Sequence, residues 1–196
     1  MTDTRKVSIE KERHVVTYAE LWHTSLCLLK QGQAQEEGSF HQFMGSLVFT
    51  AFSLEAYLNH IGPKLFQVQC WDGLERLTPQ DKLNVIAEKI GQAIDYGKRP
   101  WGIMKELFGF RNDVAHGKSI KVGKVRVVPI GKHESSMQEF EKTAWEAFCT
   151  RQNAERARKD VEDMVVILHN KANITDEYPF VGGWQETMAT VVEDAT

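Results

Sequence analysis

Apolar residues recur at intervals of three and four along several segments of the chain, and this spacing predicts amphipathic helices. The clearest stripe runs through residues 40–61. An S-x-x-Q pattern at Ser39 and Gln42, typical of a capping box, precedes it, and Gly62 followed by proline marks its expected end. Further apolar residues widen this face beyond one stripe, so we expect the helix to contact several neighbours and to be the central one.

The other helical segments are expected over residues 12–30, 78–90, 100–116, 136–148 and 153–171. Thr78, followed by proline, is a typical helix start, and Ser136 with Glu139 matches a second capping box. In the last segment, Glu155 and Lys159 have the spacing of an outer ion pair. The pattern as a whole predicts an all-α fold, a bundle of four to six helices.

After residue 116 the apolar spacing changes to two. Polar residues alternate there with a set of β-branched residues around a glycine: Ile120, Val122, Gly123, Val125 and Val127. Alternation with this period is typical of a strand. We therefore expect a short β-hairpin or an extended insertion between the fourth and fifth helical segments.

Length and composition fit one compact domain, because the chain has 196 residues, of which 42% are hydrophobic and 26% charged. Periodicity ends near residue 173, so we expect a single helical domain over residues 1–173. Residues 174–196 are expected to form a C-terminal tail that is partly flexible or docked through Phe180 and Trp184. The first residues lack the apolar core of a secretory signal, and no stretch approaches the ~20 apolar residues of a membrane span. These features predict a cytoplasmic protein with no membrane contact.

The cysteines and histidines give no sign of a cofactor. Cys27, Cys70 and Cys149 are widely separated and form no C-x-x-C pair, which predicts neither a disulfide nor a zinc site. We expect all three to be buried thiols. No group of histidines has metal-ligand spacing, and the chain contains neither a G-x-G-x-x-G pattern nor a P-loop. We therefore expect no metal and no cofactor.

Polar residues gather at the end of the fourth helical segment, in the run R-N-D-V-A-H-G. Gly117 can close the helix in the left-handed conformation, which would leave His116 in the last turn. The helix dipole favours an imidazolium there, so His116 is a candidate general acid. Asn112 and Asp113 precede it by about one turn and can orient the ring. Arg111 is a forked cation that suits phosphate oxygens.

A concentrated positive segment follows this run, although the net charge of the chain is −3. From residue 114 to residue 133 there is no acidic residue. The cations there include four candidate phosphate contacts: Lys118, Lys121, Lys124 and Arg126. Such a segment can follow an RNA backbone, or it can be an ordinary solvated surface.

The run from Arg111 to His116 resembles the R-x4-H signature of HEPN domains, in which a polar residue commonly follows the arginine. The sequence S-L-E-A-Y-L-N-H at residues 53–60 resembles the preceding long helix of several HEPN families. The resemblance covers roughly residues 18–168 and implies a HEPN-type helical bundle, which often forms a homodimer whose two motifs face each other.

Catalytic members of this family are metal-independent endoribonucleases, often toxins or phage-defence components. The resemblance implies that Arg111 stabilises the phosphate while the 2′-hydroxyl attacks it, and that His116 transfers the proton. Asn112 would orient the histidine or contact the RNA backbone. RNA and an antitoxin protein are the partners that this interpretation suggests.

Other interpretations fit the same residues. The chain can be a non-catalytic HEPN module that binds RNA, a nucleotide or a partner protein. Without the resemblance, Arg111 and His116 fit capping of helix carbonyls or pairing with Asp113 or Glu106. Glu55 interrupts the apolar helix and either lies near the motif or faces solvent. Three aromatic residues fit a core better than a base-stacking surface: Trp101, Phe108 and Phe110.

Overall fold

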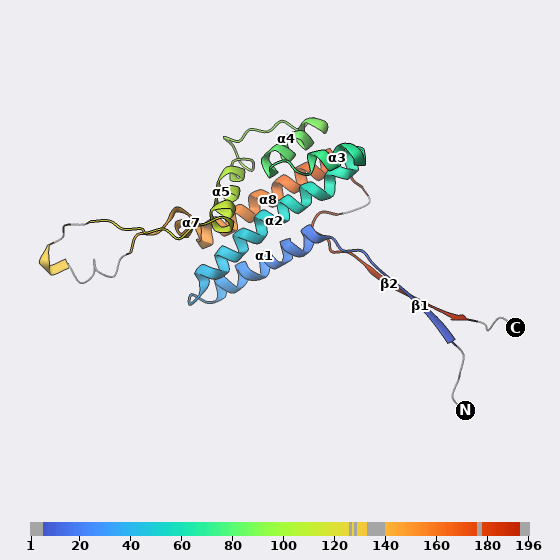
Figure 1. Ribbon diagram of the computed structural model, residues 1–196, viewed down its shortest axis with the longest axis horizontal. Helices are drawn as coiled ribbons and strands as arrows, with labels where there is room; N and C mark the ends of the chain where they lie inside the picture. The colour runs from blue at the N-terminus through green and yellow to red at the C-terminus, as the bar shows by residue number, and fades with distance from the viewer. Residues whose placement is uncertain (1–5, 126, 128, 133–139, 176–177, 193–196) are drawn as a thin grey trace, which may run out of the picture.

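The computed structural model describes residues 6–125, 127, 129–132, 140–175 and 178–192, and the chain in these ranges is mostly helical (Figure 1). A helical bundle is joined at one end to a two-stranded antiparallel ribbon. The elements are β1 Lys6–Arg13, α1 Thr17–Ala34, α2 Ser39–Leu65, α3 Val68–Leu74, α4 Pro79–Lys89, α5 Ile103–Ala115, a 3-10 turn at Ile130–Lys132, α7 Ala144–Phe148, α8 Arg151–Lys171 and β2 Gln185–Val192. The predicted helical bundle is confirmed, and the small sheet corrects the all-α class.

Helix α2 is the central element, as its wide apolar face predicts. It packs against α1 and α8 over much of its length and also contacts α3, α4 and α5. Five of its apolar side chains have no exposed surface: Leu47, Ala51, Leu54, Leu58 and Ile61. The three aromatic residues Trp101, Phe108 and Phe110 are also buried in this core, as expected.

Some predicted helix boundaries differ from the structure. Ser39 does not cap α2, because Gly38 occupies the N-cap position in the left-handed conformation and no side chain bonds the free N–H groups. The helix also continues through Gly62 and Pro63 to Leu65. The start of α4 is confirmed, since the Thr78 hydroxyl accepts a hydrogen bond from the Asp81 N–H at 3.2 Å.

The last two helices begin at threonines that the sequence analysis did not single out. Thr143 and Glu146 form a reciprocal capping box at the start of α7, whereas the expected box at Ser136 and Glu139 lies outside the described residues. Thr150 caps α8. The predicted pairing of Glu155 with Lys159 is wrong. Each has another partner four residues away, in the pairs Arg151–Glu155 and Lys159–Asp163.

Helix α3 was not predicted, because its seven residues are too few to show a helical period. It is held by Trp71, which is only 3% exposed. A Cβ at Gly62 of α2 would lie 2.2 Å from the indole ring, so the absence of a side chain there lets the ring lie against the α2 backbone.

The ribbon joins the two ends of the described chain. Strand β1 includes residues 12 and 13, so the expectation that the first helix begins at residue 12 is wrong, and α1 begins at Thr17. The strand pairs with β2, which lies in the expected C-terminal tail. Ser8 lies opposite Thr190 in this register. Before β2, the ring of Phe180 stacks on Trp22 at a centroid distance of 4.4 Å. The tail is therefore docked on α1 and then paired with the N-terminal strand.

The insertion after α5 forms no hairpin within its described residues. Residues 117–125, 127 and 129–132 contain no strand, and their only regular element is the 3-10 turn. Figure 1 shows the segment running away from the bundle as an extended excursion. The hairpin alternative is therefore wrong for these residues, and the extended alternative holds.

Two of the three thiols are exposed, which corrects the expectation that all were buried. Cys27 and Cys70 lie at the surface, and only Cys149 is buried. Burial, with a smaller effect from Glu146, raises the pKa of the Cys149 thiol to about 11. None of the helices in the described ranges has the length and apolar character needed to cross a membrane.

Candidate functional site

The end of α5 carries the motif. The helix buries one face in the core through Ile103, Met104, Leu107, Phe108 and Phe110. Its last turn reaches the surface, where His116 is the C-cap residue and its backbone N–H donates to the Asn112 carbonyl at 2.9 Å. The predicted left-handed conformation at Gly117 is wrong, since Gly117 is not among the residues with positive φ. A Cβ there would lie 2.6 Å from the Asp113 carbonyl oxygen, so glycine is needed for close approach.

Arg111 is held by an acidic side chain from the central helix. Its Nη2 donates to Oε2 of Glu55 at 2.5 Å, and the two side chains are 17% and 29% exposed. The guanidinium also lies over the ring of Phe108, 5.4 Å from its centroid. The alternative that placed Glu55 near the motif is confirmed. Pairing of Arg111 with Glu106 is excluded, because Glu106 accepts hydrogen bonds from Arg156.

The Arg111 side chain is therefore fixed in position before any ligand binds. A charge-assisted hydrogen bond between two partly buried groups is stronger than the same pair in water. The Nε of Arg111 is buried and has no hydrogen-bond partner among the described residues. The guanidinium thus keeps unused donor capacity beside its bond to Glu55.

His116 has a different environment. It is exposed, and its side chain makes no hydrogen bond or ion pair with any other described residue. The expectation that Asn112 or Asp113 orients the imidazole is therefore not met within one chain. No contact joins Arg111 to His116 among the described residues either. The imidazole is open to a partner from outside the chain.

A surface cavity of about 400 Å³ lies beside Arg111, between α4 and α5. Its lining includes two cations, Lys105 and Arg111, together with Asn112 and Gln80, and it contains no carboxylate. Phe108 and Met104 form apolar parts of the wall. The sequence pattern identified Arg111 and Asn112 but not Lys105 and Gln80, because these two residues share a cavity with the motif only in the folded chain, where the start of α4 comes beside α5.

The candidate phosphate contacts in the insertion lie beyond the helix end. Lys118, Lys121 and Lys124 are all exposed, and none of them forms an ion pair with the described residues. Arg126 lies outside the described residues. The described lysines therefore form a positive segment that starts two residues after His116 and leads away from the bundle (Figure 1).

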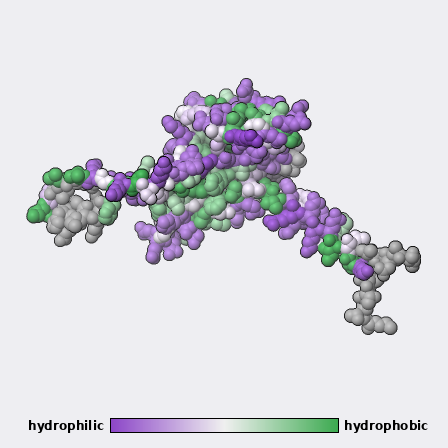
Figure 2. All heavy atoms as spheres, in the orientation of Figure 1, coloured by the Kyte–Doolittle hydropathy of each residue, from purple (hydrophilic) through white to green (hydrophobic). Residues whose placement is uncertain are grey.

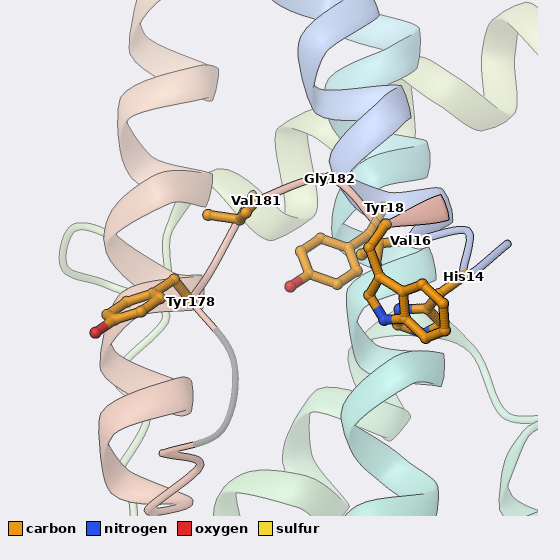
Figure 3. A pocket seen from close by; sticks show the side chains of 7 residues that line it. His14, Val16, Tyr18, Tyr178, Val181 and Gly182 are labelled. Carbon is orange, nitrogen blue, oxygen red and sulfur yellow. The ribbon is translucent and has the colours of Figure 1, made fainter. Parts of the chain in front are cut away.

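A second cavity, of about 380 Å³, lies at the base of the ribbon. Figure 3 shows His14 beside the labelled Val16 and Tyr18, with Tyr178 across the opening. The remaining lining residues come from the segment before β2. Its lining contains no lysine or arginine and none of the motif residues, so it does not offer a phosphate the same chemistry. Among the residues that the structure describes, no three His, Cys, Asp or Glu side chains are grouped in a way that could hold a metal ion.

Fold and site together define a helical-bundle protein with an arginine–carboxylate pair and an exposed histidine at the end of one helix. No family model, no curated protein and no solved structure matches the chain at a significant level.

Proposed function

We propose that the chain is a metal-independent endoribonuclease of the HEPN type, which cleaves RNA through attack of a 2′-hydroxyl on the adjacent phosphate. The observation that carries the proposal is the placement of Arg111. Glu55 holds the guanidinium at the edge of a cavity that contains a second cation and no carboxylate, and an exposed histidine ends the same helix. An anionic backbone beside a proton donor fits this arrangement.

Arg111 would bind the phosphate and stabilise the extra charge that develops on its oxygens. Its forked guanidinium matches phosphate geometry, and prior fixation by Glu55 lowers the entropic cost of using it. Lys105 would add a second positive charge at the same cavity. Phe52, which is 37% exposed and one turn from Glu55 on α2, offers a ring on which a base can stack.

His116 would supply the proton that the reaction needs. The 2′-oxygen bonds to phosphorus and loses its proton to water or a second base, the P–O5′ bond breaks, and His116 protonates the leaving 5′-oxygen. The products are a 2′,3′-cyclic phosphate and a free 5′-hydroxyl. Since no hydrogen bond or ion pair joins Arg111 to His116 in the described part of the chain, the proposal includes a homodimer in which two helix ends meet, with Asn112 contacting the RNA backbone or the partner's histidine.

The test is cleavage of varied single-stranded and looped RNAs by the purified full-length protein in EDTA. We expect 2′,3′-cyclic ends and a loss of about 10²–10⁴-fold in rate for His116→Ala. His41→Ala, an exposed histidine at the start of α2, is the matched control and should keep the wild-type rate. If the wild-type protein leaves every RNA intact, as His116→Ala does, the enzymatic proposal is wrong.

A second candidate is a non-catalytic module that binds RNA, a nucleotide or a partner protein at the same helix end. It is favoured because no described side chain orients His116 and because Glu55 already engages Arg111. His116→Gln separates the two candidates, because glutamine can donate a hydrogen bond but cannot act as a general acid at neutral pH. Retained RNA affinity with no cleavage by either protein supports binding.

The exposed lysines and the biological role each have a test of their own. Replacing Lys118, Lys121 and Lys124 by alanine should weaken RNA binding and reduce its salt dependence by up to about three charges. A role as a toxin or phage-defence component, with an antitoxin as partner, predicts that expression arrests growth of a bacterial host. His116→Ala should relieve that arrest.

A further inference from the structure

The ribbon of β1 and β2 carries an apolar face that no described part of the chain covers. Alternate residues of the two strands share a face, and its outer half consists of Val7, Ile9, Ala189 and Val191. Ile9 is 62% exposed and Val191 50% exposed. Figure 1 shows the ribbon projecting away from the helices, and Figure 2 shows hydrophobic residues gathered near its outer end. Because an isolated two-stranded ribbon is only marginally stable in water, this face calls for a partner.

One edge of β1 carries backbone groups that pair with no other described residue, and these groups lie beside the apolar face. The His14 N–H donates to the Trp184 carbonyl at 2.8 Å, in register with the strand pairing. Hydrogen-bonded and non-hydrogen-bonded pairs alternate in an antiparallel ladder, so the even-numbered residues of β1 direct their N–H and C=O groups toward β2. The backbone groups of Val7, Ile9 and Lys11 therefore face outward, where a strand edge can pair with another strand.

We infer that this edge pairs with the same edge of a second copy of the chain, antiparallel, with the two-fold axis at Ser8. In that register Val7 lies opposite Ile9 of the second copy, and Lys6 lies opposite Glu10. Each pairing occurs twice, and the two Ser8 residues face each other. Across residues 6–10 of the two copies, apolar residues meet apolar residues and opposite charges meet, which are the favourable cross-strand combinations. The resulting four-stranded sheet joins the two apolar faces into one and exceeds the three strands that independent stability requires.

Neighbouring registers of the same hydrogen-bonding phase match less well. With the axis at Ile9, Val7 would lie opposite Lys11, and with the axis at Glu10, two Glu10 carboxylates would oppose each other. The other edge of the ribbon carries no comparable pattern, because Glu186 is the only charged residue of β2. Self-pairing through β1 does not depend on the proposed ribonuclease activity.

Disulfide trapping tests the register directly. The two Ser8 residues form a non-hydrogen-bonded pair, whose Cα atoms are expected about 4.5 Å apart, within the range of a disulfide. In full-length protein carrying Cys27→Ser and Cys70→Ser, mild oxidation of Ser8→Cys should produce a covalent dimer. Thr190→Cys, directly across the ribbon from Ser8, is the matched control and should stay monomeric under denaturing conditions. If Ser8→Cys does not cross-link, or if both variants cross-link equally, the inferred pairing is wrong.

Charge exchange tests the pairing at equilibrium. Sedimentation analysis of the full-length protein without RNA should show self-association through the ribbon, and Lys6→Glu or Glu10→Lys alone should raise the dissociation constant of that contact on the order of tenfold. The double variant exchanges the two charges and should restore the wild-type value. Glu186→Lys on β2 should change nothing. A wild-type protein that stays monomeric, or a dimer that no single variant weakens, would overturn the inference and, in the second case, assign the dimer to another surface.

Discussion

The contact between Gly62 and Trp71 gives the sharpest prediction of stability. In Gly62→Ala the new Cβ would lie 2.2–2.3 Å from three carbons of the indole ring, whereas carbon atoms at rest lie about 3.5–4.0 Å apart. The ring must move by roughly 1 Å or more, and it is enclosed, since Trp71 is 3% exposed. Overpacking of this kind costs about 1–3 kcal/mol, and release of α3 from α2 would instead expose the indole at a cost of about 3 kcal/mol.

Alanine stabilises a helix by up to about 1 kcal/mol relative to glycine, which offsets part of a clash that costs about 3 kcal/mol. We therefore expect Gly62→Ala to lower the free energy of unfolding by about 2 kcal/mol. For a chain of this length that corresponds to a melting temperature lower by roughly 4–8 °C. Urea denaturation followed by far-UV circular dichroism measures the loss.

Two other helical glycines serve as controls that separate the steric clash with Trp71 from the general effect of alanine on helix stability. Gly73 in α3 and Gly109 in α5 have nothing within 4 Å of an added Cβ, so Gly73→Ala and Gly109→Ala should leave stability unchanged or raise it. In a Trp71→Leu background the penalty of Gly62→Ala should shrink, which a double-mutant cycle detects. If Gly62→Ala is as stable as the wild-type protein, the close packing of α3 on α2 is refuted.

Three further predictions concern individual side chains. Glu55→Ala should lower the free energy of unfolding by about 1–2 kcal/mol because it leaves the partly buried guanidinium of Arg111 without its acceptor. The control Glu36→Ala, at an exposed position, should stay within about 0.5 kcal/mol of wild type. Equal losses for the two variants would contradict the contact between Glu55 and Arg111. Cys27 and Cys70 should react with a thiol reagent in the folded protein, while Cys149 should react only after unfolding. The pKa of the Cys149 thiol is about 11 in the folded protein, above its ordinary value of 9.0. The contribution of this thiol to the free energy of unfolding is therefore fully present below pH 9 and is lost as the pH rises through 11. Urea denaturation at several pH values across that range would detect the loss.

The helices could be predicted where apolar spacing is regular over several turns. The central position of α2 follows from a face too wide for one neighbour, and the start of α4 follows from the Thr78 cap. The ribbon could not be predicted in this way. Its strands lie at opposite ends of the described chain, and their pairing depends on a long-range register that no local pattern contains. Helix α3 is too short for periodicity, and its stability comes from one buried indole.

The candidate site was predicted in its composition more than in its geometry. The run R-N-D-V-A-H-G identified the helix end. The interruption of an apolar stripe by Glu55 left two alternatives, a place near the motif or a solvent-facing position, and the bond to Arg111 supports the first. The orientation of His116 could not be derived, because a C-cap residue leaves the helical path and side chains one turn earlier no longer point toward it. Lys105 was missed because the cavity that it lines exists only where the fold brings residues 78–80 beside α5.

The two inferred contacts between copies use opposite ends of the molecule, and this makes them separable. The end of α5 and the insertion lie at one end of the bundle, and the ribbon leaves from the other (Figure 1). A two-fold axis at Ser8 therefore cannot bring two copies of Arg111 and His116 into one cleft. If Glu10→Lys dissociates the ribbon contact while cleavage persists, the motifs meet through a separate surface. If Glu10→Lys abolishes both cleavage and the ribbon contact, the active form must contain more than two copies. A single pair joined through the ribbon keeps its two α5 ends apart, so each α5 end would have to meet the α5 end of a further copy.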